Sequence, residues 1–239
     1  MIVSINITGL TFKNGKADAD GGGAIYFSNA ISNSNINASF INNTATSGGA
    51  NYFKGTVSTS NVTGTYINNN AERIGGANGF HGSVSGSNVS GIYINNNAMY
   101  GGANYFYTEV SGSNVSGIYI NNTATAMYGG ANYFYNKVSG SNVGGIYINN
   151  TAHGQDVYHG GGANYFGNDV SGSTVSGTYT NNKAEYYGGA NNFQASVSNS
   201  TVSGTYTNNT AKYNGGANYF YRSVSGSNIT GTYTNNNKC

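Results

Sequence analysis

A glycine-rich triplet recurs along the whole chain at nearly constant intervals, and this repeat limits the folds that the sequence can adopt. Gly-Gly-Ala occurs eight times in the 239 residues, and its alanines are Ala24, Ala50, Ala77, Ala103, Ala131, Ala163, Ala190 and Ala217. The steps between them are 26, 27, 26, 28, 32, 27 and 27 residues. Self-similarity at a period of roughly 20 to 50 residues is typical of solenoids and other repeat proteins.

Most of each repeat has a fixed length. Val62 follows Ala50 by 12 residues and Tyr66 comes four residues later, and the same two steps lead to a β-branched and an aromatic residue in every copy. An Asn-Asn pair then follows, as at Asn68 and Asn69. All the length variation lies between the next alanine and the following Gly-Gly. In a solenoid the stacked strands must keep their register, whereas a surface corner tolerates insertions.

The spacing of apolar residues identifies the type of solenoid. They recur at even steps, as from Val62 to Tyr66, between segments rich in Gly, Asn, Ser and Thr, and this pattern excludes helical repeats. The sequence therefore predicts an all-β protein: one single-stranded parallel β-helix domain spanning residues 1–239. We expect about 27 residues and three short strands per rung, with eight full rungs after a partial first one. At a strand spacing of about 4.8 Å the rod is roughly 40 Å long.

Composition argues against several other classes. Only 7% of residues are charged and the net charge is +2, so electrostatic repulsion does not favour disorder, and 22 Tyr supply area for a core. The nine Lys and Arg are scattered singly, which argues against nucleic acid binding. No window approaches the roughly 20 apolar residues of a membrane span, and residues 1–10 lack the features of a signal peptide. Cys239 is the single cysteine and cannot join an internal disulfide.

The Asn pairs and the strand alternation make further structural predictions. Asn tolerates the left-handed backbone of a corner, and Asn side chains stacked on successive rungs hydrogen-bond along the axis. If Val62 and Tyr66 point inward, Thr65 and Ile67 point outward and begin a flat β-branched face. The reverse parity would place the Ile and Thr side chains in the core. In the first case the face continues through Ile92/Ile94, Ile118/Ile120, Ile146/Ile148, Thr178/Thr180, Thr205/Thr207 and Thr232/Thr234.

Two repeat segments resemble those of known surface proteins. Gly22-Gly23-Ala24-Ile25 and the segment from Phe40 to Ala45 are similar to repeats of the polymorphic outer-membrane proteins (Pmp) of chlamydiae and of adhesin-like proteins of methanogenic archaea. Asn replaces Ile25 in every later copy, and Gly-Gly-Ala-Asn-Tyr-Phe is closest to the archaeal group. The resemblance implies a right-handed β-helix on a cell surface, as a fragment of a longer protein that presents its loops to a glycan or protein of another cell or the matrix.

Candidate binding residues lie at the corner of variable length. The longest corner loop, at residues 153–160, contains His153, Asp156, Tyr158 and His159, and we expect a ligand-binding tip there. Its two His and one Asp are possible metal ligands, but their spacing matches no tight motif, so no metal or cofactor is predicted. Tyrosines just before Gly-Gly are expected either to shield the neighbouring turn or to form an aromatic strip suited to sugar rings or protein surfaces: Tyr100, Tyr128, Tyr158, Tyr187 and Tyr213.

The carboxylates give little support for catalysis. Seven Asp and Glu residues are present, and only Asp156 and Glu185 are expected to approach each other, without a cluster of cations beside them. The sequence thus favours a non-enzymatic, extracellular, adhesin-like surface module. The alternatives are a structural rod that associates through its Ile/Thr face or its ends, and an ice-binding protein, because a regular Thr-x-Thr array resembles the surface of ice-binding β-solenoids.

Overall fold

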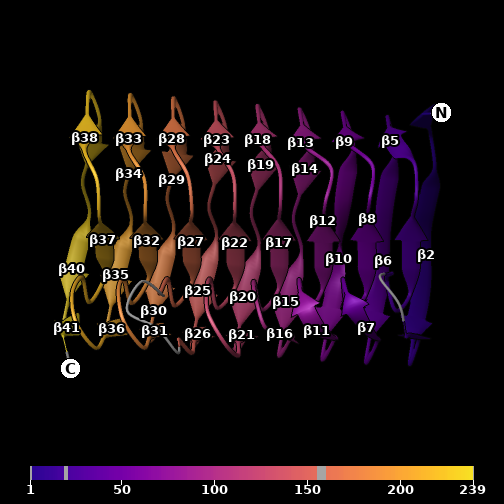
Figure 1. The fold of residues 1–239 in the computed structure, drawn as a ribbon, viewed down its shortest axis with the longest axis horizontal. Helices are drawn as coiled ribbons and strands as arrows, with labels where there is room; N and C mark the ends of the chain where they lie inside the picture. Colours follow the sequence, from indigo (N-terminus) through magenta and orange to yellow (C-terminus); the bar gives the residue numbers. More distant parts are fainter. Residues whose placement is uncertain (1, 19–20, 155–159, 239) are drawn as a thin grey trace.

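The chain folds into a parallel β-helix, as the repeat predicts (Figure 1). The computed structural model describes residues 2–18, 21–154 and 160–238, so Cys239 lies outside the described residues. Strands one repeat apart pair in parallel register, for example Asn78 with Asn51 on one side and with Asn104 on the other. The described strands form four sheets along the rod, which we name sheets A to D.

Sheet A is built from a two- or three-residue strand in each rung, whose Val or Ile points inward. Its nine strands confirm the eight rungs and a first, incomplete one. They are β1 (Ile2–Val3), β5 (Ala30–Ser32), β9 (Val57–Ser58), β13 (Val84–Ser85), β18 (Val110–Ser111), β23 (Val138–Ser139), β28 (Val170–Ser171), β33 (Val197–Ser198) and β38 (Val224–Ser225).

Sheet B carries the predicted β-branched and aromatic positions. Its first three strands are continuous, and later rungs split into two short strands around a glycine such as Gly91, whose φ is 149°. A Cβ at Gly91 would lie 2.3 Å from the Gly64 carbonyl oxygen, so only glycine fits at this position. The strands are β2 (Asn6–Lys13), β6 (Asn35–Ile41), β10 (Asn61–Ile67), β14 (Asn88–Val89), β15 (Ile92–Ile94), β19 (Asn114–Val115), β20 (Ile118–Ile120), β24 (Asn142–Val143), β25 (Ile146–Ile148), β29 (Thr174–Val175), β30 (Thr178–Thr180), β34 (Thr201–Val202), β35 (Thr205–Thr207), β39 (Asn228–Ile229) and β40 (Thr232–Thr234).

Sheets C and D flank the Gly-Gly corner. Sheet C contains β3 (Lys16–Ala17), β7 (Thr44–Ser47), β11 (Asn70–Ile74), β16 (Asn97–Ala98), β21 (Thr123–Ala124), β26 (Thr151–Ala152), β31 (Lys183–Ala184), β36 (Thr210–Ala211) and β41 (Asn237–Lys238). Sheet D contains β4 (Ile25–Phe27), β8 (Asn51–Phe53), β12 (Asn78–Phe80), β17 (Asn104–Phe106), β22 (Asn132–Phe134), β27 (Asn164–Phe166), β32 (Asn191–Phe193) and β37 (Asn218–Phe220). A typical rung thus has five short strands in four sheets, a finer division than the three strands expected from the sequence.

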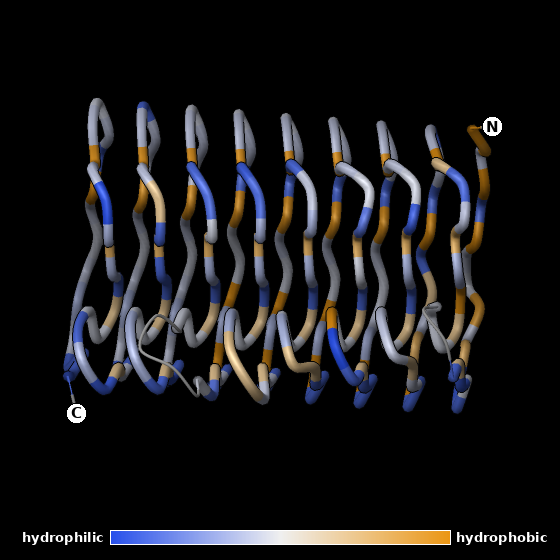
Figure 2. The backbone as a smooth tube through the Cα atoms, viewed as in Figure 1, coloured by the Kyte–Doolittle hydropathy of each residue, from blue (hydrophilic) through white to orange (hydrophobic). Residues whose placement is uncertain are grey.

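The core consists of columns in which each rung repeats the side chain below it, and these columns appear as hydrophobic bands along the axis (Figure 2). Val62 and Tyr66 are fully buried, whereas Ile92 and Ile146 on the same sheet are 39% and 42% exposed. The predicted parity is therefore confirmed. Tyr93 and Tyr119 stack with ring centroids 4.7 Å apart, and Phe106 and Phe134 stack at 4.8 Å, so aromatic columns fill the interior.

Buried asparagines form the predicted ladder. Asn95, the first member of its pair, adopts φ 54°, and Asn96 is fully buried behind it. The Asn96 Nδ2 donates to Asn122 Oδ1 at 3.0 Å and to the Tyr66 carbonyl at 3.0 Å, and the Asn96 backbone N–H donates to the same Asn122 oxygen at 3.0 Å. The amides of this ladder therefore stay hydrogen-bonded away from water.

A second ladder begins where Asn replaces Ile25. The Asn51 Nδ2 donates to Asn78 Oδ1 at 3.0 Å, and Asn78 donates to Asn104 at 2.9 Å. Ile25 occupies the same position one rung earlier and cannot donate to Asn51. The Asn51 Oδ1 accordingly has no hydrogen-bond partner among the described residues.

Candidate functional site

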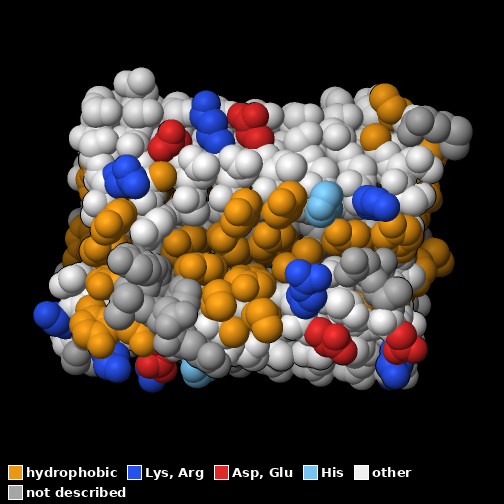
Figure 3. Space-filling view, in the orientation of Figure 1, with side chains coloured by type: hydrophobic (Ala, Val, Ile, Leu, Met, Phe, Trp, Pro, Cys, Tyr) orange, Lys and Arg blue, Asp and Glu red, His pale blue; other side chains and the backbone are white. Residues whose placement is uncertain are grey.

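Tyrosines gather on the outside of the corner between sheets C and D. Alternation in the Asn-Tyr-Phe strands buries Asn and Phe and turns the Tyr outward, at Tyr105, Tyr133 and Tyr165. The residue just before Gly-Gly lies beside this column, which brings Tyr100 and Tyr128 against the same rings. Figure 3 shows that apolar side chains form a band along this face of the rod.

We call the central part of this band the tyrosine surface, which comprises Tyr100, Tyr105, Tyr107, Tyr128, Tyr133, Tyr135 and Tyr165. Ring centroids are 5.1 Å apart for Tyr105 and Tyr133 and 5.2 Å apart for Tyr133 and Tyr165, both in edge-to-face geometry. Tyr128 lies 4.3 Å from Tyr165. Together with Tyr100, these rings hold one another in place, so the tyrosine surface is already ordered before a ligand binds.

The tyrosine surface has an inner and an outer layer. Tyr105, Tyr133 and Tyr165 are buried beneath their neighbours, and burial, followed by repulsion from neighbouring tyrosines, raises the pKa of all three hydroxyls above the ordinary value of 10.0. Tyr107 and Tyr135 are exposed and stack on each other at 5.2 Å with an angle of 12° between their rings. The exposed pair is the part that a ligand reaches first.

The structure divides the strip expected from the sequence. Tyr100 and Tyr128 lie on adjacent rungs with centroids 6.1 Å apart. Gly160, however, occupies the place between Tyr128 and Tyr187, and Asn214 occupies the place expected for Tyr213. The strip is therefore interrupted at Gly160. Tyr213 lies one residue further from Gly-Gly than Tyr187 does, although the two ring centroids are still 6.0 Å apart.

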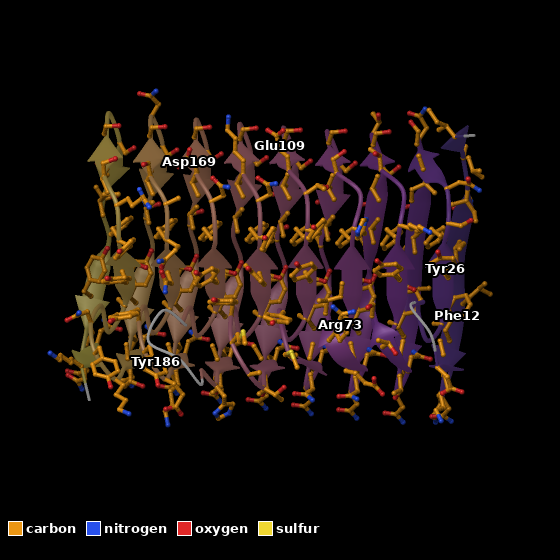
Figure 4. All side chains as sticks on the ribbon, viewed as in Figure 1. Phe12, Tyr26, Arg73, Glu109, Asp169 and Tyr186 are labelled. Carbon is orange, nitrogen blue, oxygen red and sulfur yellow. The ribbon has the colours of Figure 1, made fainter. Side chains whose placement is uncertain are left out.

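Tyr187 and Tyr213 belong to a second aromatic cluster near the last rungs, whose member Tyr186 is labelled in Figure 4. Tyr213 stacks on Tyr186 at 5.3 Å, and the Lys212 ammonium lies 5.5 Å from the Tyr213 ring centroid. Tyr187 stacks on Tyr219 at 4.5 Å. This cluster is smaller than the tyrosine surface, and Gly160 stands in the column between the two.

Much of the predicted loop tip lies outside the described residues, namely Asp156, Tyr158 and His159. His153 is described and exposed, and its Nδ1 lies 3.7 Å from Glu185 Oε1 on the next rung. Glu185 therefore approaches an imidazole, and its expected convergence with Asp156 stays a prediction. Among the residues that the structure describes, no three His, Cys, Asp or Glu side chains gather where a metal ion could bind.

Sequence reasoning missed three features. The first is that the tyrosine surface includes Tyr105, the Tyr of an Asn-Tyr-Phe strand, and Tyr107, the residue after its Phe. Period-two alternation could have found both, because it predicts that they point outward. A polar groove of about 610 Å³ also runs along the rod beside Asn61, Asn88 and Asn114. The Asn88 Nδ2 donates to Asn61 Oδ1 at 2.7 Å, so the groove amides hydrogen-bond along the axis. The third feature is a hollow beside sheet D that is lined in part by Tyr52 and Tyr105.

None of the described segments forms a helix long and apolar enough to span a membrane. The outward Thr pairs that suit ice binding occupy only β30, β35 and β40, and that function stays a prediction that a thermal-hysteresis assay tests. Comparisons of the chain with protein-family models, with curated proteins and with solved structures find no significant match to any of them.

Proposed function

We propose that this chain is a non-enzymatic, adhesin-like module of a cell surface that binds carbohydrate through the tyrosine surface. The observation that carries the proposal is the packing of seven tyrosines into one patch on a rigid β-helix. The resemblance of its repeats to those of surface adhesins supports the extracellular location. We do not assign it an enzymatic activity.

Carbohydrate suits this surface better than a protein partner does. Tyrosine combines a flat apolar ring with a hydroxyl that donates and accepts hydrogen bonds, and the face of a sugar ring combines C–H groups with hydroxyls in the same way. The exposed Tyr107 and Tyr135 rings stack with their centroids 5.2 Å apart, so two amphipathic side chains stand side by side on neighbouring rungs. Tyrosine also loses little conformational entropy when it is immobilised.

The test is binding of the purified chain to a glycan array, followed by calorimetry on the best neutral glycan. We expect Tyr128→Ala/Tyr135→Ala to weaken binding at least tenfold, because ring contacts at the centre of an interface contribute most of its energy. Tyr26→Ala is the matched control, since Tyr26 is an exposed tyrosine of sheet D several rungs away (Figure 4). Equal binding by the double variant, or no glycan bound by the wild type, would contradict the proposal.

A second candidate, a structural rod, rests on the outward Ile columns of sheet B. Ile92 and Ile146 of these columns are 39% and 42% exposed. An exposed apolar column of this kind is a surface that a second copy of the chain can cover. If rods associate side by side, size-exclusion chromatography will show concentration-dependent oligomers that Ile92→Lys/Ile146→Lys abolishes. A monomer at all concentrations would remove this candidate.

A further inference from the structure

Two rungs lack the outward tyrosine of sheet D: β32 carries Asn192 in its place and β12 carries Gly79, and beside Gly79 the surface is hollowed. Gly79 of β12 lies in register between Tyr52 of β8 and Tyr105 of β17. The hollow has a volume of about 280 Å³ and is lined mainly by Tyr52, Arg73, Ile74, His81, Tyr105 and Tyr107. Pockets for drug-sized ligands begin at about 300 Å³, so this one suits a single ring.

The walls of the hollow are aromatic and fixed by packing. Tyr52 and Tyr105 are two rungs apart, which corresponds to about 9.6 Å at the usual strand spacing. Tyr52 leans toward the gap, since a Cβ on Gly79 would lie 2.9 Å from its Cδ2. Tyr105 is held by Tyr133, and the two rings are 5.1 Å apart. A six-membered ring inserted here contacts aromatic surface that is already in place.

The rim of the hollow is basic. Arg73 is exposed on β11 and has no ion pair among the described residues (Figure 4). His81 lies on the opposite side, where its ring stacks on Tyr107 at 4.8 Å. Glu72 is the chain neighbour of Arg73 and does not line the hollow. The Arg73 guanidinium therefore lies beside aromatic rings at the hollow with its N–H donors available. A guanidinium binds a carboxylate through two parallel hydrogen bonds.

We propose that this hollow binds the carboxylate-bearing ring of a hexuronate residue, with the sugar ring between Tyr52 and Tyr105 and its carboxylate on Arg73. The inference rests on the proposed carbohydrate binding and deepens it, because it makes an acidic glycan the preferred ligand. The hollow is at one end of the tyrosine surface, so a glycan that continues along the rod from the hollow passes over Tyr107 toward Tyr135.

The experiment compares an oligogalacturonate with its fully methyl-esterified form by titration calorimetry. We expect the wild type to bind the free acid about tenfold more tightly, the range of one charge-assisted hydrogen bond, and the preference to shrink as NaCl is raised. Arg73→Gln should remove the preference for the free acid. Gly79→Tyr restores Asn-Tyr-Phe; its Cβ would displace the Tyr52 ring and lie 3.3 Å from the Gly48 backbone nitrogen. This variant should fill the hollow and remove the preference as well.

The matched control is Arg222→Gln, because Arg222 is the second arginine of the chain and also lies near a tyrosine, 6.0 Å from the Tyr221 ring. It should keep the full preference for the acid. Equal affinity of the wild type for acid and ester, or a preference that survives in both Arg73→Gln and Gly79→Tyr, overturns the inference. Binding of neutral glycans that depends on Tyr128 and Tyr135 would in that case still support the proposed function, whereas the absence of all glycan binding would overturn both.

Discussion

The inside and the outside of the same rungs follow different rules. Inside, each rung repeats its neighbour: Asn96 hydrogen-bonds to Asn122, and Tyr93 stacks on Tyr119 at 4.7 Å. Outside the corner between sheets C and D, one column changes from Tyr52 to Gly79 within a single rung. The two regions share a backbone register and differ only in what their side chains contact.

This difference follows from stacking. An inward side chain contacts the same residue type on both neighbouring rungs, so a change affects three rungs at once. An outward side chain faces solvent on at least one side and is free to vary. In a repeat protein the regular columns therefore indicate stability, and a break in a regular outward column, as at Gly79, indicates a place to look for recognition.

The largest expected effect concerns the buried tyrosine column of sheet B under alkaline conditions. Burial is the main cause that raises the pKa of each of its six members above 10.0, and they are Tyr66, Tyr93, Tyr119, Tyr147, Tyr179 and Tyr206. The unfolded chain ionises near pH 10 while the folded chain stays protonated. The free energy of unfolding should thus be independent of these groups below pH 10 and fall by about 1.4 kcal/mol per pH unit for each tyrosine above it.

Urea unfolding followed by circular dichroism between pH 8 and pH 11.5 measures this slope. Tyr119→Phe is the control, because Phe40 already occupies this column and stacks on Tyr66 at 4.9 Å. The substitution removes the hydrogen bond from the Tyr119 hydroxyl to the Ser116 carbonyl, at a cost of about 1 kcal/mol. Above pH 10 the free energy of unfolding of the variant should fall less steeply with pH, by the contribution of one tyrosine. A pH-independent stability up to pH 11.5 would show that the column is accessible to water.

The next largest effect should come from one amide of the interior ladder. Asn122→Ala removes the acceptor of the Asn96 backbone and side-chain N–H groups and the donor to the Tyr93 carbonyl, all in a buried position. We expect the free energy of unfolding to fall by about 4 kcal/mol, because buried polar groups lose their partners. Denaturant unfolding at pH 7 measures it.

The neighbouring residue supplies the matched comparison. Asn121 is exposed at the corner with φ 54°, a conformation that glycine adopts without strain. Asn121→Gly should change the free energy of unfolding by less than about 1 kcal/mol. Similar losses for the two variants would mean that the ladder contributes no more than the corner does.

The sequence predicts the architecture well because the repeat itself is the structural unit. The rung count, the inward Val62 and Tyr66 and the Asn ladder all follow from fixed spacing. The division of each rung is less predictable: two-residue strands such as β13 and β16 are too short to show an alternating pattern, so three strands were expected where four sheets form.

The candidate site is predictable only in part. Tyr100 and Tyr128 are found by their distance from Gly-Gly, whereas Tyr213 lies one residue further from Gly-Gly and Asn214 stands in the column. The buried rings of Tyr105 and Tyr133 become visible only when two sheets are placed side by side. Arg73 is on β11 of sheet C and His81 follows β12 of sheet D, and nothing in their sequence spacing indicates that they line one hollow.

The smallest expected effect tests the outward face of sheet B against its inward face with the same new residue. Ile92→Thr introduces the residue that later rungs already carry at this position, where the side chain is 39% exposed, and should change the free energy of unfolding by less than about 0.5 kcal/mol. Val89→Thr keeps the volume but places a hydroxyl in the fully buried column, and it should cost about 2 kcal/mol. Thermal and urea unfolding of the two variants measure the contrast. If Ile92→Thr is as costly as Val89→Thr, the Ile columns are covered in solution by another chain, and lateral association of rods through the Ile/Thr face becomes the better account of this surface.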